Sequence, residues 1–284
     1  MKFSLLAVML LMILSCDNAE NNKVVKPVED LKTETITTIH PEWTEALITN
    51  NLTGSVHIWD KTRNTLHHSD SSLFDVTNVP ASTFKIFLSL MALEQGIVKD
   101  ENEVWKWDEK KQSVESWNHD QNMTEAFANS TNWFYQNIND KIDTETMKSW
   151  LNKADYGCTS IDGKEKYWLE PGFEISPAQQ FDFLKRLHDD DLPFSQRSMD
   201  VTKKIMLRKD TLGVKIYGKT GWGVPNGINV GWYVGWAEKD SSTFYFATCI
   251  EQPEPASKNF ADLRISTIYN ALTSLGVLSS SNHN

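Results

Sequence analysis

The sequence predicts an α+β fold, in which an antiparallel sheet is built from both chain ends and flanked by helices, with a mostly helical middle insertion. Runs rich in β-branched and aromatic residues occur near residues 54–60 and again after residue 212. Between about 101 and 207 the spacing of apolar residues is that of amphipathic helices. With 284 residues, 40% of them hydrophobic, and 11 tryptophans, the chain can build one large packed core.

Residues 1–15 have the pattern of an export signal, because a Lys precedes an apolar run that is short for a membrane span. The Leu-Ser before Cys16 resembles a bacterial lipobox. This predicts cleavage before Cys16 and lipid on its sulfur, whereas ordinary signal cleavage nearby is the alternative. We therefore expect an exported lipoprotein on the periplasmic side, with the lipid anchor as its membrane contact.

Residues 16–38 are polar and aperiodic, and they are interpreted as a flexible tether to a catalytic domain at 39–284. "GSVHIWD" and "NTLHHSD" flank the turn-like "KTRN" and predict a hairpin. After Leu212, three β-rich runs, "GVKIYGKTG", "INVGWYVGWAE" and "STFYFATCIE", predict an antiparallel meander. The amphipathic "NFADLRISTIYNALTSLG" then predicts a closing helix, and "MKSWLNKA" and "PAQQFDFLKRLHDD" are the clearest helices of the insertion.

The charge and the histidine spacing argue against a nucleic-acid partner and against a metal site. The net charge is −10, and the 28 Lys and Arg residues form no basic run, so a nucleic acid is not an expected partner. The seven histidines lack the spacing of a metal site, and we expect no metal. Cys158 and Cys249 either form a disulfide or are buried thiols, and a monomer and a homodimer are both compatible with the sequence.

The segment "VPASTFKIFLSLMALEQG", Val79 to Gly96, is apolar around its whole circumference and should be a buried helix. Lys85 lies in its first turn, three residues after Ser82, so the amine and the hydroxyl share a face. Desolvation and the positive end of the helix dipole should lower the pKa of the Lys85 amine. A neutral amine there can take the serine proton and make Ser82 a nucleophile.

Serine and lysine at this spacing are common by chance, but two further motifs follow. "NSTNWFYQ" supplies Ser130, and "YGKTGW" supplies Lys219, Thr220 and Gly221. The order S-x-x-K, serine triplet and K-T-G is the signature of serine β-lactamases and penicillin-binding proteins. Taken singly, K-T-G could be a solvated turn and Ser130 could lie on the polar face of a helix. Together, the three motifs favour a catalytic site.

The sequence resembles the class D β-lactamases, or oxacillinases. The residues that carry the resemblance span nearly all of the chain after the tether: "PASTFK", "KWD", "WNHD", "YG", "YWLE", "ISPAQQ", "KTGW", "GWYVGW" and "DLR". The resemblance implies hydrolysis of the β-lactam amide of penicillins through an acyl-enzyme on Ser82, and hence antibiotic resistance.

The resemblance also implies the roles of individual residues. The N–H groups of Ser82 and Trp222 would form an oxyanion hole, and Ser130, with Lys219 nearby, would relay a proton to the leaving nitrogen. Lys219 and an arginine fork would bind the substrate carboxylate. The expected substrate-binding residues are Thr220, Gly221, Trp222, Arg264 and Trp117.

The class D resemblance further implies that CO2 carbamylates Lys85 to N6-carboxylysine. The carbamate would be the general base of acylation and deacylation, and Trp168 of "YWLE" would donate a hydrogen bond to it. CO2 or bicarbonate would then be the only small molecule required, with no other cofactor.

Two positions depart from the class D pattern. Cys158 replaces an Asn after "YG", and Asn132 replaces a Val two residues after Ser130. An amide at 132 can accept a hydrogen bond from the Lys85 ammonium and thereby oppose carbamylation. The sequence therefore leaves two alternatives open. One is a β-lactam sensor, which is acylated by the drug but loses the acyl group very slowly. The other is a peptidoglycan DD-peptidase or transpeptidase.

Overall fold

The computed structural model describes residues 35–157, 161 and 166–279. The expected signal peptide, Cys16 and nearly all of the tether lie outside the described residues, as does Cys158. Cys249 is described, and it is a buried free thiol whose pKa is raised by burial.

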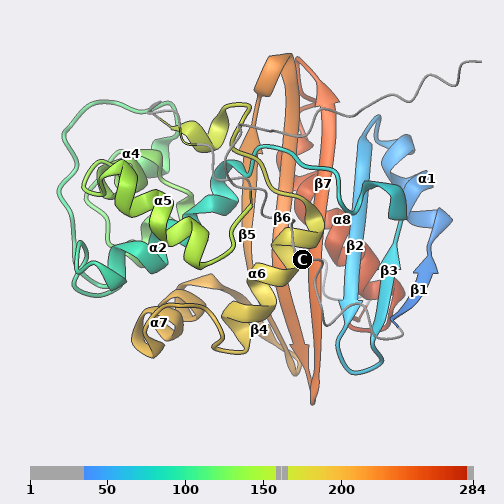
Figure 1. Cartoon of the computed structure of the whole chain (residues 1–284). Helices are drawn as coiled ribbons and strands as arrows, with labels where there is room; N and C mark the ends of the chain where they lie inside the picture. Colours follow the sequence, from blue (N-terminus) through green and yellow to red (C-terminus); the bar gives the residue numbers. More distant parts are fainter. Residues whose placement is uncertain (1–34, 158–160, 162–165, 280–284) are drawn as a thin grey trace, which may run out of the picture. The chain divides into compact units, whose positions relative to one another are not determined.

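Strands from both ends of the chain form one seven-stranded sheet (Figure 1). The strands are β1 (Ile36–Ile39), β2 (Thr53–Asp60), β3 (Thr65–His68), β4 (Leu207–Thr211), β5 (Val214–Gly223), β6 (Ile228–Lys239) and β7 (Ser242–Pro253). Their order across the sheet is β1-β3-β2-β7-β6-β5-β4. All neighbours are antiparallel except β1 and β3, which are parallel. The α+β class, the β2–β3 hairpin and the β5–β6–β7 meander are confirmed.

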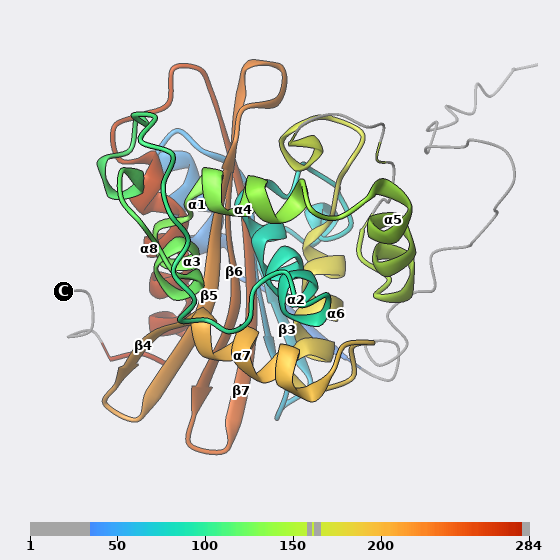
Figure 2. The ribbon, with the colours of Figure 1, turned by 90° about the vertical axis from the view of Figure 1, so that its left-hand side faces the viewer.

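Helices cover both faces of this sheet (Figures 1 and 2). On one face, α1 (Pro41–Thr49) contacts β2, and α8 (Phe260–Ser274) contacts β2, β5, β6 and β7. On the other face, α6 (Pro177–His188) contacts β6 and β7, and α7 (Gln196–Met206) contacts β5. Two further helices, α2 (Lys85–Glu94) and α3 (Met123–Asn129), pack against α7 on that side, and α4 (Asn132–Asn139) packs against both of them. The helix α5 (Thr144–Lys153) completes the insertion.

The period-two alternation of β6 separates the two cores. Tyr233 and Ala237 belong to the core beneath α8, together with Leu263. Trp232 and Trp236 point to the opposite face, where Trp236 lies edge-on to His188 of α6. Nearly every residue of β6 is therefore buried, which explains why its sequence is an almost continuous apolar run.

The two edge strands and α1 were not predicted from the sequence. β1 begins at Ile36, so the sheet includes residues that the sequence analysis placed in the tether at 16–38. Three of the four residues of β1 are exposed, and β4 reads "LRKDT", so neither strand shows apolar alternation. Short, polar edge strands are common because they discourage pairing with other chains. The stretch 95–122 is also less helical than expected, with turns and one short 3-10 helix, η4 (Glu115–Trp117).

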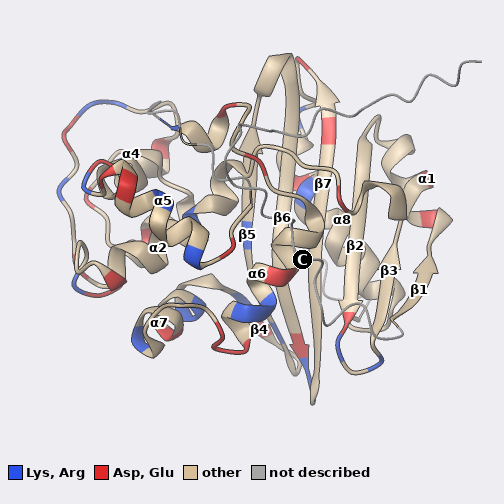
Figure 3. Ribbon diagram, in the orientation of Figure 1, with Lys and Arg blue, Asp and Glu red and all other residues tan. Residues whose placement is uncertain are grey.

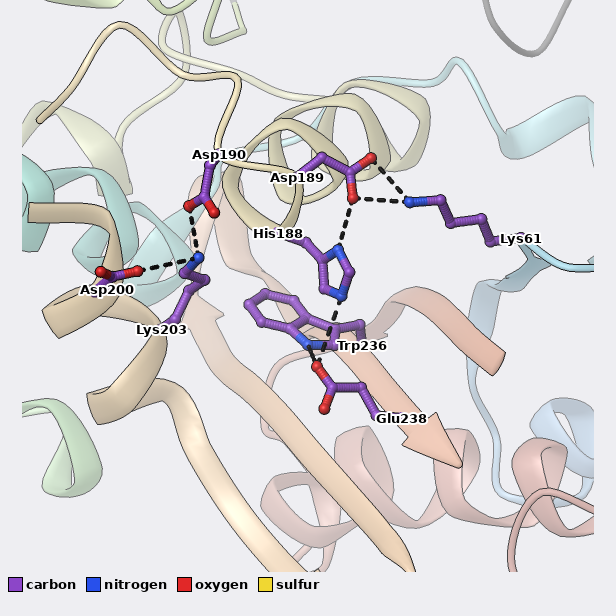
Figure 4. Close-up of polar contacts among 8 residues, drawn as sticks. All are labelled: Lys61, His188, Asp189, Asp190, Asp200, Lys203, Trp236 and Glu238. Carbon is purple, nitrogen blue, oxygen red and sulfur yellow. Dashed lines mark hydrogen bonds and ion pairs between the residues drawn. The ribbon is translucent and has the colours of Figure 1, made fainter. Parts of the chain in front are cut away.

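A polar cluster fastens the end of α6 to two parts of the sheet (Figure 4). Asp189 accepts from Nδ1 of His188 (2.7 Å) and from Nζ of Lys61 (2.8 Å), which lies between β2 and β3. On its other side, Nε2 of His188 lies 3.6 Å from Glu238 of β6, and the same carboxylate accepts from the indole of Trp236 (3.2 Å). The cluster thus joins the end of α6 to the β2–β3 turn and to β6, which come from the two halves of the chain.

Acidic and basic residues are mixed over the helices and loops, whereas the strands other than β4 are mostly uncharged (Figure 3). Among the described residues, no helix combines the length and the apolar character that crossing a membrane would require.

Candidate active site

Ser82 lies in a short 3-10 helix, η3 (Ala81–Phe84), that runs directly into α2. Ala81, just before it, is fully buried and has a φ of +48°, a region that costs energy for a residue with a Cβ. The sheet holds this turn in place, because the indole of Trp232 donates to the carbonyl of Val79 over 2.9 Å. The strained turn beside Ser82 is thus held in place by packing against β6.

Lys85 is the first residue of α2, and its side chain is completely buried. Its Nζ donates to Oγ of Ser82 (2.9 Å), to the carbonyl oxygen of Ser130 (2.9 Å) and to Oδ1 of Asn132 (2.7 Å). Desolvation lowers the pKa of Lys85 from 10.5 to about 7. A substantial fraction of the amine is therefore neutral at physiological pH and lies within hydrogen-bond reach of the serine hydroxyl.

Ser130 caps the C-terminus of α3 with a φ of +57°, in the left-handed region. Its Oγ receives Nζ of Lys219 at 2.9 Å and lies 3.3 Å from Nζ of Lys85. The hydroxyl is therefore held between two amines and can both take up and pass on a proton.

Lys219 projects from β5 and is only 2% exposed. Burial, followed by the positive charges of Lys85, Arg208 and Arg264, holds its pKa well below the usual value. The ring of Phe127 lies 5.5 Å from Nζ of Lys219 and 5.0 Å from the guanidinium of Arg208. The face of an aromatic ring attracts the protonated form of each group and partly compensates its desolvation. Neither Phe127 nor Arg208 was predicted from the sequence, because they belong to no motif.

Arg264 reaches the site from α8. Its Nη1 donates to the carbonyl of Gly221 (2.8 Å), and its guanidinium lies 5.5 Å from the ring of Trp222. Gly231 of β6 makes room for it, since a Cβ there would lie 2.8 Å from Cγ of Arg264 and from Cζ of Phe260. Burial lowers the pKa of Arg264 to about 10, so the side chain remains a cation at neutral pH.

These groups surround a cavity of about 570 Å³. It is lined by Ser82, Val114, Trp117, Ala128, Asn129, Ser130, Asn132, Thr220, Trp222, Val224, Ala261 and Arg264. None of these residues is acidic, and several are apolar. An apolar cavity with a few convergent polar groups and a cation suits a small organic anion.

The comparison with known proteins agrees with this geometry. The penicillin binding protein transpeptidase domain family matches residues 45–271. Beta-lactamase OXA-48 of Klebsiella pneumoniae is 33% identical over 212 residues, which cover 74% of this chain and 80% of that protein. This chain belongs to the class D β-lactamase family. A class D β-lactamase structure from Sebaldella termitidis covers 86% of this chain and 99% of its own, with a TM-score of 0.82 and 33% identity.

A regulatory protein is also similar to this chain. Regulatory protein BlaR1 of Bacillus licheniformis is 31% identical over 191 residues, which cover 66% of this chain but 32% of that protein. The class D enzymes are hydrolases that need no metal cofactor. In the described part of this chain, no three His, Cys, Asp or Glu side chains gather as potential metal ligands.

Not every residue expected from the class D resemblance lines the cavity. Trp168 is 3% exposed in the 3-10 helix η5 (Tyr167–Leu169), where its ring centroid lies 5.8 Å from that of Phe84 beside the catalytic helix. Its expected hydrogen bond to a modified Lys85 stays a prediction. Gly221 offers its carbonyl to Arg264, and a Cβ there would lie 2.9 Å from the carbonyl oxygen of Pro80. Gly221 therefore lets β5 approach the turn that carries Ser82.

The remaining expected site residues come together. Ser82, Ser130, Thr220, Trp222, Arg264 and Trp117 all line the cavity, and Lys85 and Lys219 lie behind two of them. Val114 and Val224, which were not predicted, add exposed apolar side chains to its wall. No motif marks these two valines, so only the folded chain reveals them.

Proposed function

We propose that this protein hydrolyses the lactam amide of penicillins through an acyl-enzyme on Ser82, and that this activity confers antibiotic resistance. The supporting observation is the 2.9 Å contact between Nζ of Lys85 and Oγ of Ser82, with burial lowering the pKa of the amine to about 7. A buried base beside an alcohol nucleophile is the arrangement that acyl transfer requires.

In acylation, the neutral amine of Lys85 takes the proton of the Ser82 hydroxyl as Oγ attacks the lactam carbonyl carbon. The carbonyl oxygen, which becomes negative, accepts hydrogen bonds from the N–H groups of Ser82 and Trp222. Ser130 donates its proton to the lactam nitrogen as the C–N bond breaks, and Lys219 returns a proton to the Ser130 oxygen.

The substrate carboxylate binds where positive charge is already fixed. Arg264 remains a cation at neutral pH, and Thr220 beside it offers a hydroxyl. Lys219 adds a third donor from β5. The apolar cavity wall, which includes Trp117, would accommodate the acyl side chain of a penicillin.

Deacylation needs a base for the attacking water. Carbamylation of Lys85 by CO2 would supply one, with Trp168 as a hydrogen-bond donor to the carbamate. The groups around Nζ are mostly acceptors, namely the carbonyl of Ser130 and Oδ1 of Asn132. Such acceptors suit an N–H donor, whereas a carbamate needs donors. The surroundings of Nζ therefore fit the amine better than the carbamate.

This arrangement supports a second candidate function, a β-lactam receptor that acylates rapidly and deacylates slowly. Its specific support is the 2.7 Å contact between Nζ of Lys85 and Oδ1 of Asn132. The similarity to the BlaR1 regulatory protein points the same way.

Penicillin turnover by the purified protein, with and without bicarbonate, separates the two functions, and Ser82→Ala is the control. Sustained turnover that rises with bicarbonate and disappears in Ser82→Ala supports the hydrolase. A single stoichiometric burst, with the drug retained on Ser82 in the mass spectrum, would overturn the hydrolase in favour of the receptor.

We also propose that the mature protein begins at a lipidated Cys16 and is held on the periplasmic side by this anchor. The lipobox-like residues before Cys16 support this proposal. Mass spectrometry of the mature N-terminus tests it, since an N-terminus without an acyl group would rule the anchor out.

A further inference from the structure

We propose that Gln121 and Thr131, two residues outside the cavity, are positioning residues that hold Ser130 where it can protonate the leaving nitrogen. This inference rests on the acylation chemistry proposed above. It adds a pair of side chains, from the loop before α3 and from the start of α4, that act on the reaction through Ser130.

Gln121 is fully buried, and both ends of its amide are hydrogen-bonded. Its Nε2 donates to the carbonyl of Ser116 over 2.7 Å, and its Oε1 accepts from Oγ1 of Thr131 over 2.7 Å. Because a carbonyl can only accept, the Ser116 contact fixes which end of the amide is nitrogen. The hydroxyl of Thr131 must then be the donor to Gln121.

Thr131 lies directly between two residues that contact Nζ of Lys85, Ser130 and Asn132. It is fully buried, and its N–H donates to the carbonyl of Ala126 over 2.8 Å. The preceding Ser130 has a φ of +57°, a conformation that persists only where the surroundings enforce it. The hydroxyl of Thr131, tied to Gln121, is one of the contacts that enforce it.

Two indoles join the same loop to the same turn. Nε1 of Trp117 donates to the carbonyl of Asn129 over 2.9 Å. Nε1 of Trp133 donates to the carbonyl of Trp117 over 2.8 Å. Hydrogen bonds therefore join residues 117–121 to Thr131 and to the chain on both sides of it. These bonds hold the cavity wall at Trp117 and the turn at Ser130 together.

The chemical consequence concerns a single step. An amine leaving group must be protonated as the C–N bond breaks, whereas a thiolate leaves without a proton. A misplaced Ser130 should therefore slow acylation by a lactam and spare acylation by a thioester. Errors of about 1 Å in the position of a catalytic group cost on the order of 100-fold in rate.

The test compares Thr131→Val, which removes the hydroxyl at nearly constant size, with Thr131→Ser, which keeps it. Stopped-flow acylation is measured with benzylpenicillin and with an acyclic thioester that carries the same acyl side chain. We expect Thr131→Val to slow acylation by the penicillin by roughly 10- to 100-fold. Acylation by the thioester should change by less than about threefold, and Thr131→Ser should behave like the wild type with both substrates.

Gln121→Met provides a second variant with the same expected selectivity, because it removes both side-chain hydrogen bonds at similar volume. If Thr131→Val acylates normally, or slows both substrates equally, the positioning role is wrong. If the wild type is acylated by neither substrate, the proposed function itself fails, and this inference fails with it.

Discussion

Nζ of Lys85 lies 2.7 Å from Oδ1 of Asn132 and 2.9 Å from Oγ of Ser82. One amine is thus shared between the nucleophile and an amide at the N-terminus of α4. Burial favours the neutral amine, which can act as a base toward Ser82, whereas the contact with Asn132 favours the protonated form. The balance between the two decides how Lys85 behaves once Ser82 is acylated.

Replacing Asn132 by valine should increase bicarbonate-dependent turnover of penicillin. A hydrogen bond to a charged group contributes about 1.5–3 kcal/mol, so its loss should favour carbamylation by roughly 10- to 100-fold. Turnover as a function of bicarbonate, and the 13C signal of a labelled carbamate, measure the effect. Asn132→Asp, which keeps an acceptor facing Lys85, should show no gain. An equal response of the Asn132→Val variant and the wild type would contradict the proposed effect of Asn132.

The rate of acylation should rise with pH through about 7 and then level off. Lys85 accepts a proton only when it is neutral, and its pKa is lowered to about 7 by burial. Single-turnover acylation between pH 5 and pH 9 measures the profile. Lys85→Arg, which cannot deprotonate in this range, should lose acylation at every pH. A rate that falls as the pH rises through 7 would exclude Lys85 as the base.

Lys85→Met should stabilise the fold at neutral pH while it abolishes acylation. The folded protein loses the Lys85 proton near pH 7, and the unfolded chain loses it near 10.5. The unfolded state binds more protons within this window, so wild-type stability rises with pH there. We expect a gain of on the order of 1–3 kcal/mol at pH 7, which should shrink as the pH approaches 10. Urea unfolding of both proteins at several pH values tests the trend.

Arg264→Lys should weaken the capture of substrates that carry a carboxylate. The guanidinium donates to Gly221 while facing the cavity, and a lysine cannot reproduce this planar fork. We expect a loss of roughly 10- to 100-fold in the second-order acylation rate with penicillin. The methyl ester of the same penicillin, which lacks the charge, is the matched control and should lose much less. Equal losses for acid and ester would mean that Arg264 serves mainly to hold β5.

How much of the fold is predictable depends on burial. The runs of β6 and β7 are distinctive because both faces of these strands are buried, and the run of β5 is distinctive because buried residues alternate with more exposed ones. The edge strands β1 and β4 bury little, so their sequences resemble loops. The apolar pattern of a segment reflects which of its side chains are buried. Prediction of strands from this pattern is therefore weakest at the edges of the sheet.

Some residues of the site can be predicted from the sequence and others cannot. Ser82, Lys85 and Lys219 are recognisable because their chemistry demands one residue type at a fixed spacing. Arg208 and Gln121 are each hydrogen-bonded to a residue ten positions further along the chain, Gly218 and Thr131, and neither belongs to a motif that would predict its place near the site. Such supporting residues become visible only when the contacts are known.

The pairing of β2 with β7 has a consequence for the order in which the protein is made. Residues 53–60 find their partners at 244–251, near the opposite end of the chain. During synthesis, Ser82, Lys85, Ser130 and Lys219 therefore leave the ribosome before β7, the strand that joins β2 to β6 in the sheet. Contacts between residues so far apart in the sequence form slowly, and the sheet cannot be completed until β7 has been synthesised. A premature stop at the start of β7 would leave Ser82, Lys85, Ser130 and Lys219 in the product and no complete sheet on which to hold them.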